Sequence, residues 1–323
     1  MRFTVDRLLE PFSFSQFCEE WYEKRPLFIG RKSPAYYDGV LTLDALNAQL
    51  QLDQEDEEDA LARLYAGHPV AIPYELPLRH ELERVFHAPV ASRVYLMPAG
   101  GGRRAAGSDA FILQFAGTTE WVVRDLTATL EPGDLLYVPG KFRHEARPSN
   151  ALSAHIAFTL EKFTYADLLR HIADNAHASE WLRKSLPPDF RSVAASDEFL
   201  RHVHEFFDDA DLPAYLERMH SDFAEERVPD STNRLADYVS LPSIGAASRF
   251  RKRLGLWPEL TNGGDKVELT FHRKSLEFPA AAAASLRAMI DAEEFAASAL
   301  PGLVDANLAL CRTLVREGFL TIV

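Results

Sequence analysis

The spacing of hydrophobic residues changes along this chain of 323 residues. In "SFSQFCEEWYEKRPLFI" (13–29), Phe14, Phe17 and Trp21 recur at helical intervals. Pro26 then predicts the end of the helix, because a proline disfavours helical geometry in the residue before it. The pattern therefore predicts a helical lead-in.

From about residue 91 to residue 160 the pattern changes to short β-strands. The runs are "SRVYLM", "AFILQFAG", "TEWVVRDL", "TATL", "DLLYVP" and "LSAHIAFTL". They are rich in Val, Ile, Phe, Tyr and Thr, and Gly, Pro, Asp and Asn separate them, as is typical of strands joined by turns. So many short strands favour a sandwich or barrel over a parallel α/β sheet. In "EPGDLLYVPGKFRHEA" (131–146), His144 lies on the strand that returns after a second turn.

After Phe163 the pattern becomes helical again, in "YADLLRHIADNA", "SDEFLRHVHEFFDD" and "LPAYLERMHSDFAEE". The last segment mixes a hairpin-like pair, "VELTFHRKSLEFP", an alanine-rich helix (280–291), and a final helix that Gly318 ends before an apolar strand. Helices with a small hairpin indicate a winged-helix-like module. We expect three parts: residues 1–165 with the β core, a helical segment at 166–234, and a C-terminal domain at 235–323.

Composition and charge exclude several classes of protein. The net charge of −13 disfavours overall attraction to nucleic acid or to an anionic membrane, and "RFRKRLG" (249–255) is the one dense basic stretch. Cys18 and Cys311 lie too far apart in the chain to indicate a disulfide framework or a cysteine-based zinc site. No signal-type apolar core or apolar run of membrane-spanning length is visible. We expect a cytoplasmic protein.

Four stretches together resemble a known family. They are "WYEKRPLFI", "AFILQFAGTTEW", "TLEPGDLLYVPGKFRHEA" and "LSAHIAFTL". In their order and spacing they are similar to the JmjC-like branch of the cupin superfamily, specifically the ribosomal-protein hydroxylases. The resemblance implies a mainly β core, the double-stranded β-helix barrel, followed by a helical dimerisation segment and a winged-helix-like C-terminal module. It also implies iron(II) and 2-oxoglutarate as cofactors, with iron held by two histidines and a carboxylate.

The implied metal ligands are incomplete in this sequence. His144 matches the distal histidine, but the His-x-Asp pair of the family falls, by counting back from the "FILQFAG" strand, on Arg104 and Ala106. An arginine is a permanent cation and an alanine has no donor atom, so neither can hold a metal. Asp109 is the nearest carboxylate, and strand alternation turns it to the opposite face. His155 is predicted to lie inside the barrel near His144.

The expected anchor for 2-oxoglutarate is also absent. Where the resemblance implies a basic residue after the strand, this chain has "GTTEW", which places Thr118 and Thr119 at those positions. A threonine hydroxyl can donate to a carboxylate, but without the charge-assisted strength of a guanidinium. The loss of both features is the pattern expected of a barrel that is not used for iron chemistry.

Two orientations stay open for the arginine pair at 103 and 104: inward, where a cation would replace iron and suit an anionic ligand, or outward into solvent. We expect a binding or regulatory protein without cofactor, with a protein or peptide partner in the barrel groove, and a homodimer formed through the central helices. The alternative is an iron(II) and 2-oxoglutarate hydroxylase of a protein side chain, with His144 and substitute ligands. DNA contact by the C-terminal module is a third hypothesis. The candidate pocket residues are His144, Arg104, Thr119, His155 and Tyr137.

Overall fold

The structure is a computed structural model with two compact units, Met1–Lys162 and Phe163–Val323. It describes residues 4–31, 33–37, 62–63, 66, 68, 70–73, 77–149, 152–186, 188, 197–227, 229–231 and 233–323. None of the helices in these ranges is long and apolar enough to cross a membrane.

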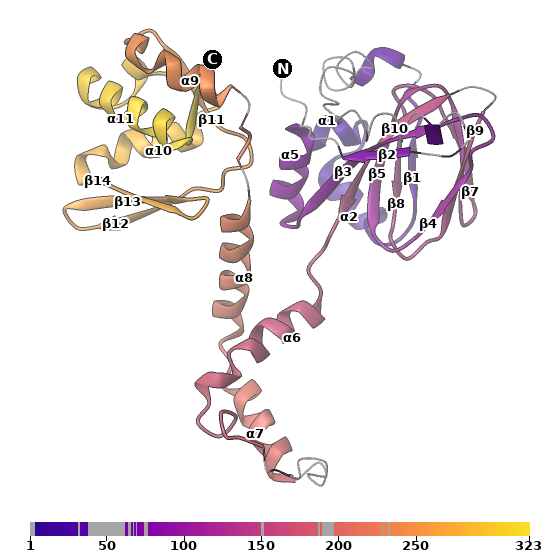
Figure 1. The fold of residues 1–323 in the computed structure, drawn as a ribbon, viewed down its shortest axis with the longest axis horizontal. Coiled ribbons are helices and arrows are strands. Elements are labelled where there is room, and N and C mark those ends of the chain that lie inside the picture. Colours follow the sequence, from indigo (N-terminus) through magenta and orange to yellow (C-terminus); the bar gives the residue numbers. More distant parts are fainter. Residues whose placement is uncertain are drawn as a thin grey trace. The chain divides into compact units, whose positions relative to one another are not determined.

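The first unit contains two antiparallel sheets that build the barrel (Figure 1). The larger sheet has the strand order β1-β8-β5-β10-β3-β2, and the smaller has the order β4-β9-β6-β7. This confirms the predicted barrel of short strands. The elements are α1 (Val5–Leu9), α2 (Phe14–Glu20), β1 (Leu27–Ile29), η1 (Pro34–Tyr37), β2 (Val70–Pro73), α5 (Pro77–Phe86), β3 (Val90–Met97), β4 (Arg103–Ala105), β5 (Asp109–Ala116), β6 (Thr119–Val123), β7 (Leu126–Leu130), β8 (Leu135–Val138), β9 (His144–Pro148) and β10 (Ser153–Leu160).

The larger sheet is buried on both of its faces. On β5, Phe111 and Leu113 pack with α1, α2 and α5 on the outer face, where Phe17 of α2 lies 5.5 Å from Phe111 between ring centroids. Ala110 and Ile112 alternate with them and face the barrel interior. A strand buried on both faces has a continuous apolar run and no alternation, which explains the "AFIL" sequence.

The "EPGD" turn is fixed by its own carboxylate. Asp134 is buried and accepts hydrogen bonds from the backbone N–H of Glu131 at 2.9 Å and of Arg31 at 2.8 Å. Gly133 has a φ of 98°, and a Cβ there would lie 2.0 Å from the Ser33 carbonyl oxygen. The turn before β8 therefore packs against the segment that follows β1, and only glycine fits at position 133.

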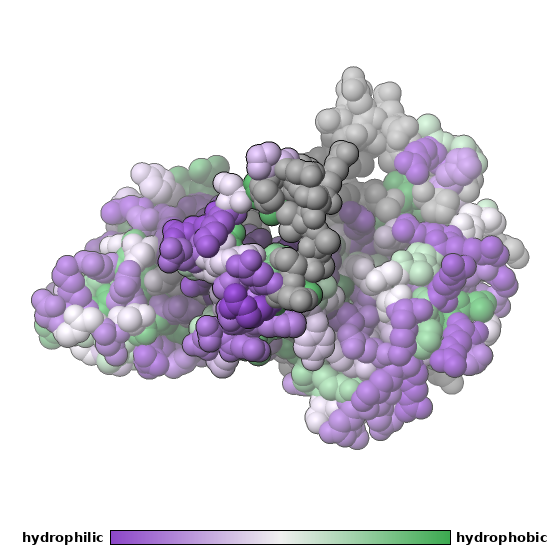
Figure 2. Space-filling model, turned by 90° about the horizontal axis from the view of Figure 1, so that it is seen from below, coloured by the Kyte–Doolittle hydropathy of each residue, from purple (hydrophilic) through white to green (hydrophobic). Residues whose placement is uncertain are grey.

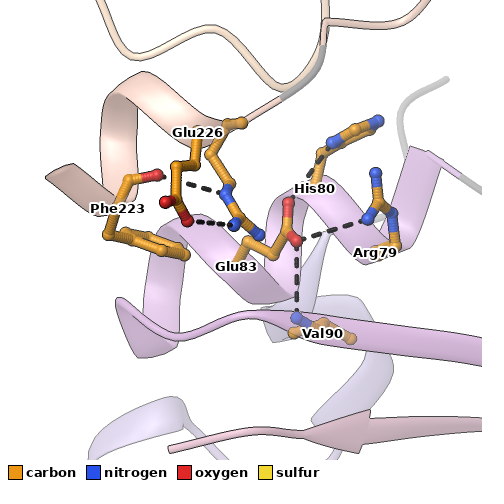
Figure 3. Close-up of polar contacts among 7 residues, drawn as sticks. Arg79, His80, Glu83, Val90, Phe223 and Glu226 are labelled. Carbon is orange, nitrogen blue, oxygen red and sulfur yellow. Dashed lines mark hydrogen bonds and ion pairs between the residues drawn. The ribbon is translucent and has the colours of Figure 1, made fainter. Parts of the chain in front are cut away.

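A buried carboxylate on α5 contacts its own helix and the next strand. Glu83 is 1% exposed and accepts from the Val90 N–H at 3.4 Å. Its carboxylate lies 3.5 Å from both Arg79 Nη1 and His80 Nδ1, and all of these side chains point toward Glu83 in Figure 3. These contacts hold the end of α5 against the start of β3.

The second unit begins with helices. Thr164 and Asp167 form a capping box at the start of α6, and Phe223 on α8 packs edge-on against Trp257 at 5.3 Å. After α8, Arg227 donates to the Phe223 carbonyl at 3.1 Å beside Glu226 (Figure 3). The helices are α6 (Tyr165–Asp174), η2 (Ala176–Ala178), α7 (Asp197–Asp208) and α8 (Leu212–Glu226).

The rest of the second unit has two small sheets, β15-β11-β16 and β12-β13-β14, packed with helices around one core. The predicted hairpin is present as β13 and β14, and Gly318 ends α11 with a φ of 85° as predicted. The elements are α9 (Arg234–Ser240), η4 (Leu241–Ser243), β11 (Arg249–Lys252), β12 (Glu259–Gly263), β13 (Lys266–Phe271), β14 (Lys274–Pro279), η5 (Ala280–Ala282), α10 (Ala283–Asp291), β15 (Phe295–Ala296), η6 (Ala297–Ala299), α11 (Val304–Glu317) and β16 (Leu320–Ile322).

The basic stretch at 249–255 is largely engaged within this unit. Arg253 is 3% exposed and pairs with buried Asp237, which also accepts from Thr321 at 2.7 Å. Arg249 lies 3.0 Å from Glu294, and Lys252 donates to the Ile290 carbonyl at 3.2 Å. The stretch that looked like a DNA contact in the sequence therefore includes a structural arginine.

On the face drawn in Figure 2, hydrophilic residues predominate and hydrophobic ones are scattered among them.

Candidate functional site

His144 is the first residue of β9 and faces the barrel interior. It pairs with Ala105 of β4 on one side and with Val123 of β6 on the other, and buried Ala146 lies two residues further along the same face. The pKa of His144 is lowered by burial, partly restored by a hydrogen bond to the Phe142 backbone, and lowered again by the Arg103 charge. Its imidazole is therefore held toward the neutral form.

The register of β4 decides which arginine faces the interior. Arg103 pairs with Ala146 and Ala105 with His144, while Arg104 pairs with Glu145. Directly opposed residues of two strands share a face, so Arg103 and Ala105 lie on the interior side. Arg104 is on the outer side, 81% exposed, with its Nε 3.0 Å from the Glu145 carboxylate.

The sequence-based positions for the missing ligand pair were thus shifted by one residue. Counting placed the pair at Arg104 and Ala106, but the structure places Arg103 and Ala105 inside. Arg104, predicted as a pocket residue, lies with Glu145 on the outer side of β4, and it lines a pocket there together with His144. The glycine-rich stretch before β4 has no hydrophobic alternation from which the face could be read.

A row of neighbouring rings runs through the interior, starting beside Arg103 on β4. The Arg103 guanidinium lies 4.4 Å above the Tyr95 ring, and Tyr95 stacks on His155 at 5.1 Å. His155 meets the edge of Trp121 at 5.2 Å, and Trp121 lies 5.8 Å from His144. His155 and His144 are therefore in one cluster, connected through Trp121.

His155 is 2% exposed, and burial lowers its pKa to about 3, with smaller contributions from the charges of Arg103 and His144. The imidazole is neutral over the physiological range. Its Nδ1, the Nδ1 of His144, the Nε1 of Trp121 and the Oε1 of Gln114 are buried without a hydrogen-bond partner among the described protein atoms. The interior therefore contains unpaired polar atoms on several neighbouring side chains.

Thr119, predicted as a pocket residue at the position of the cosubstrate anchor, is fully buried. Its hydroxyl lies 2.5 Å from the Ser153 hydroxyl, which also accepts from the Gln114 amide at 2.7 Å. The same amide donates to the carbonyls of Ala116 and Gly117 at 2.8 and 3.2 Å. Thr119 is therefore committed to a polar network that joins β5, β6 and β10.

Tyr137 does not belong to this cluster. It packs on the outer face of the larger sheet, with its ring centroid 4.8 Å from that of Phe17. Its hydroxyl donates to Asp109 and accepts from the Glu23 N–H at 2.9 Å. The prediction that Tyr137 lines the pocket was wrong. Both faces of its strand are apolar, so sequence alternation could not distinguish inside from outside.

The donor atoms near His144 do not form an iron site in the described part of the chain. There, no group of three His, Cys, Asp or Glu residues lies close enough to hold a metal ion. Asp109 is on the outer face, where it accepts from the Gly140 N–H at 2.8 Å and lies 3.0 Å from Lys162 Nζ. Alternation predicted that Asp109 lies on the face opposite to Arg104, and this was wrong, because a bend separates β4 from β5 and both residues lie on the outer side. The residues present therefore do not fit the two-histidine, one-carboxylate arrangement.

Trp121, Tyr95 and Gln114 are interior residues that sequence reasoning missed. Alternation within "TEWVV" places Trp121 on the face of Thr119, and this signal could have found it. Tyr95 and Gln114 are set inside by the pairing of β10 with both neighbours, in which His155 lies opposite each of them. That pairing is a long-range contact with no local sequence signal.

Comparison with known proteins shows which proteins this chain is similar to. A model described as "JmjC domain" matches residues 125–168. Ribosomal oxygenase 2 of Bos taurus is 25% identical over 77% of this chain and 71% of its own length, and the Rattus norvegicus protein of that name is 24% identical over 49% and 47%. The bifunctional lysine-specific demethylase and histidyl-hydroxylase NO66 of Branchiostoma floridae is 26% identical over 66% of this chain and 42% of its own length.

Solved structures show the same fold over nearly the whole chain. The ribosomal oxygenase YcfD from Escherichia coli, in complex with cobalt and 2-oxoglutarate, covers 97% of this chain and 98% of its own with a TM-score of 0.55 and 16% identity. The same protein with cobalt and succinic acid gives a TM-score of 0.54. The sequence matches and the shared fold together show that this chain is similar to the JmjC-like ribosomal oxygenases.

Proposed function

We propose that this chain is a binding or regulatory protein on a JmjC-like barrel and that it has no iron-dependent oxygenase activity. The observation that carries the proposal is the register of β4, which puts Arg103 and Ala105 on the interior face beside His144. A guanidinium cannot ligate a cation, and alanine has no donor atom. The named relatives are oxygenases, but oxygenase activity of this chain would require two substitute ligands that the described residues do not offer.

The interior also offers 2-oxoglutarate no basic anchor at the family position. Thr119 stands there, and its hydroxyl is already bonded to Ser153. A dicarboxylate bound at that point would lack a charge-assisted partner and would have to compete with an existing hydrogen bond. The missing basic anchor therefore supports the proposal independently of the missing metal ligands.

We further propose that the groove of the barrel receives a protein or peptide, and that the chain forms a homodimer through the helices of residues 166–234. Tyr165 and Leu169 on α6 are 92% and 53% exposed, and Leu212 and Leu216 on α8 are 48% and 52% exposed. Apolar side chains one helical turn apart form a stripe that suits a partner surface. The C-terminal module is winged-helix-like in this proposal, with no role in nucleic-acid binding.

Metal titration of matched double variants tests the absence of an iron site. Wild-type protein is expected to bind neither Mn²⁺ nor Fe²⁺ stoichiometrically and to leave 2-oxoglutarate unconsumed. The variant Arg103→His with Ala105→Asp would complete a His-x-Asp pair beside His144, so it should gain a metal site. The control Arg104→His with Ala106→Asp puts the same residue types on the outer face and should gain nothing.

The opposite outcome is equally concrete. Stoichiometric Fe²⁺ in the wild-type protein, lost in His144→Ala and accompanied by 2-oxoglutarate turnover, would establish the alternative of a protein side-chain hydroxylase. Metal binding by the control pair alone would show that the register of β4 is wrong.

A further inference from the structure

The barrel interior holds several polar atoms without hydrogen-bond partners on side chains that are near one another. Gln114, Trp121 and His155 are 0%, 4% and 2% exposed, and each has a polar atom without a hydrogen-bond partner among the described protein atoms. His144, half-buried next to Trp121, has another at Nδ1. Leaving a buried polar group unpaired costs roughly 1–3 kcal/mol. Several such groups within one cluster of contacting side chains therefore indicate a site that a ligand completes.

A permanent cation lies at one end of this set. Arg103 stacks on Tyr95, which in turn stacks on His155. Within the described ranges, none of the ion pairs involves Arg103, whereas its neighbour Arg104 is paired with Glu145. Arg103 is itself exposed, and its contact with the Tyr95 ring uses none of the guanidinium N–H donors.

We propose that the barrel interior binds a carboxylate group, with the Arg103 guanidinium and the Trp121 indole N–H as donors. The proposal rests on the proposed function, since it assigns to a metal-free barrel the class of ligand that it takes. Arginine and an indole N–H are donors only, and neutral imidazoles can donate through Nδ1. A planar anion with two acceptor oxygens matches this set. A cation or a donor-only group at the Arg103 end does not match it, and a neutral acceptor would lack the charge-assisted strength.

The carboxylate can come from a free small acid or from an Asp or Glu side chain of a peptide partner. Gln114 Oε1 is an unpaired acceptor, and the amide nitrogen of Gln114 already donates to Ser153 and two carbonyls. A ligand with a hydroxyl or amide donor next to its carboxylate would therefore satisfy more of the site than acetate would.

The Trp121 indole gives a direct readout in the full-length protein. The chain has 4 tryptophans, so an ¹⁵N–¹H spectrum has one indole signal from each, and Trp121→Phe assigns the signal of interest. Succinate is expected to shift that signal saturably, whereas succinamide, which has the same shape without charge, should not. In a second arm, an acetylated, amidated peptide with one glutamate is compared with its glutamine counterpart, which distinguishes the peptide source from the free acid.

Two single variants on the same strand locate the cation. Arg103→Gln should weaken succinate or peptide binding by about tenfold or more, because it removes a charge-assisted hydrogen bond. Arg104→Gln removes an equal charge from the outer face and should keep wild-type affinity.

The proposal is overturned if no carboxylate shifts the Trp121 signal, if succinamide acts like succinate, or if both arginine variants bind equally. These results are distinguishable from a failure of the proposed function, which the metal titration reports independently. A barrel that binds neither metal nor carboxylate would refute this inference alone.

Discussion

His155 links the interior of the barrel to the pH dependence of stability. Its pKa is about 3 in the folded protein and 6.5 in the reference state, so below pH 6.5 the unfolded chain takes up a proton that the folded chain refuses. The stabilisation that comes from a neutral His155 is complete above pH 6.5 and is lost as the pH falls toward 3. Within this pH range, His155 can lower the free energy of unfolding by at most about 1.4 kcal/mol for each pH unit.

The variant His155→Phe keeps a ring against Tyr95 and Trp121 and removes the titrating nitrogens. The free energy of unfolding is measured by urea denaturation at pH 7 and at pH 4.5. Its decrease from pH 7 to pH 4.5 should be about 2 kcal/mol smaller in the variant than in the wild type. His144 keeps part of the dependence in both proteins, because its pKa is lowered in the same direction. An unchanged difference between the two pH values would show that His155 is accessible to protons.

Asp109 is a structural carboxylate on the outer face of the same sheet. It is 2% exposed and accepts from Tyr137, the Gly140 N–H and Lys162. The variant Asp109→Ala leaves these donors without an acceptor, so the free energy of unfolding should fall by roughly 3 kcal/mol. Glu120→Ala, which removes a half-exposed carboxylate 3.3 Å from Arg147, should cost less than about 1 kcal/mol. Equal losses in the two variants would contradict the structural role.

At the scale of the element, the turn before β8 depends on glycine for two separable reasons. A side chain at Gly133 meets both an unfavourable positive φ and the Ser33 carbonyl, whereas Gly100 has a φ of 76° and no atom within 4 Å of its would-be Cβ. Gly100→Ala should therefore show only the conformational penalty, about 1 kcal/mol. Gly133→Ala should cost at least about 2 kcal/mol more in thermal or urea unfolding. Similar costs would mean that the Ser33 segment moves away freely.

The strands and helices were predictable because their signals are local. The runs "AFILQFAG" and "DLLYVP" became β5 and β8, and Gly318 ends α11 where the sequence predicts it. Which side of a strand faces the interior was predictable only where polar and apolar residues alternate. The faces of Arg104, Asp109 and Tyr137 were not predictable, since "GGGRRAA" has no alternation, a bend separates Asp109 from that stretch, and "LLYV" is apolar on both faces. The barrel closes through pairings between distant strands, and these decide the faces.

At the scale of the whole molecule, the exposed stripes on α6 and α8 are among the apolar features that a single copy of the chain leaves uncovered in its described residues. Leu216 on α8 is 52% exposed, and burying a leucine is worth about 1.5–3 kcal/mol, counted twice in a symmetric dimer. Leu216→Asp should therefore raise the dimer dissociation constant by about 100-fold or more. Leu303→Asp changes a leucine that is 79% exposed outside these helices and should leave the dimer intact.

Light scattering coupled to size exclusion, over a dilution series, measures this directly. The chain has a mass of 36.3 kDa. The molar mass from light scattering should be roughly twice that value for the wild type and for Leu303→Asp, and that of one chain for Leu216→Asp. Circular dichroism of the variants separates dissociation from unfolding. A wild-type protein that stays at 36.3 kDa at the highest concentration would refute the homodimer, and the stripe would then be free for the protein or peptide partner.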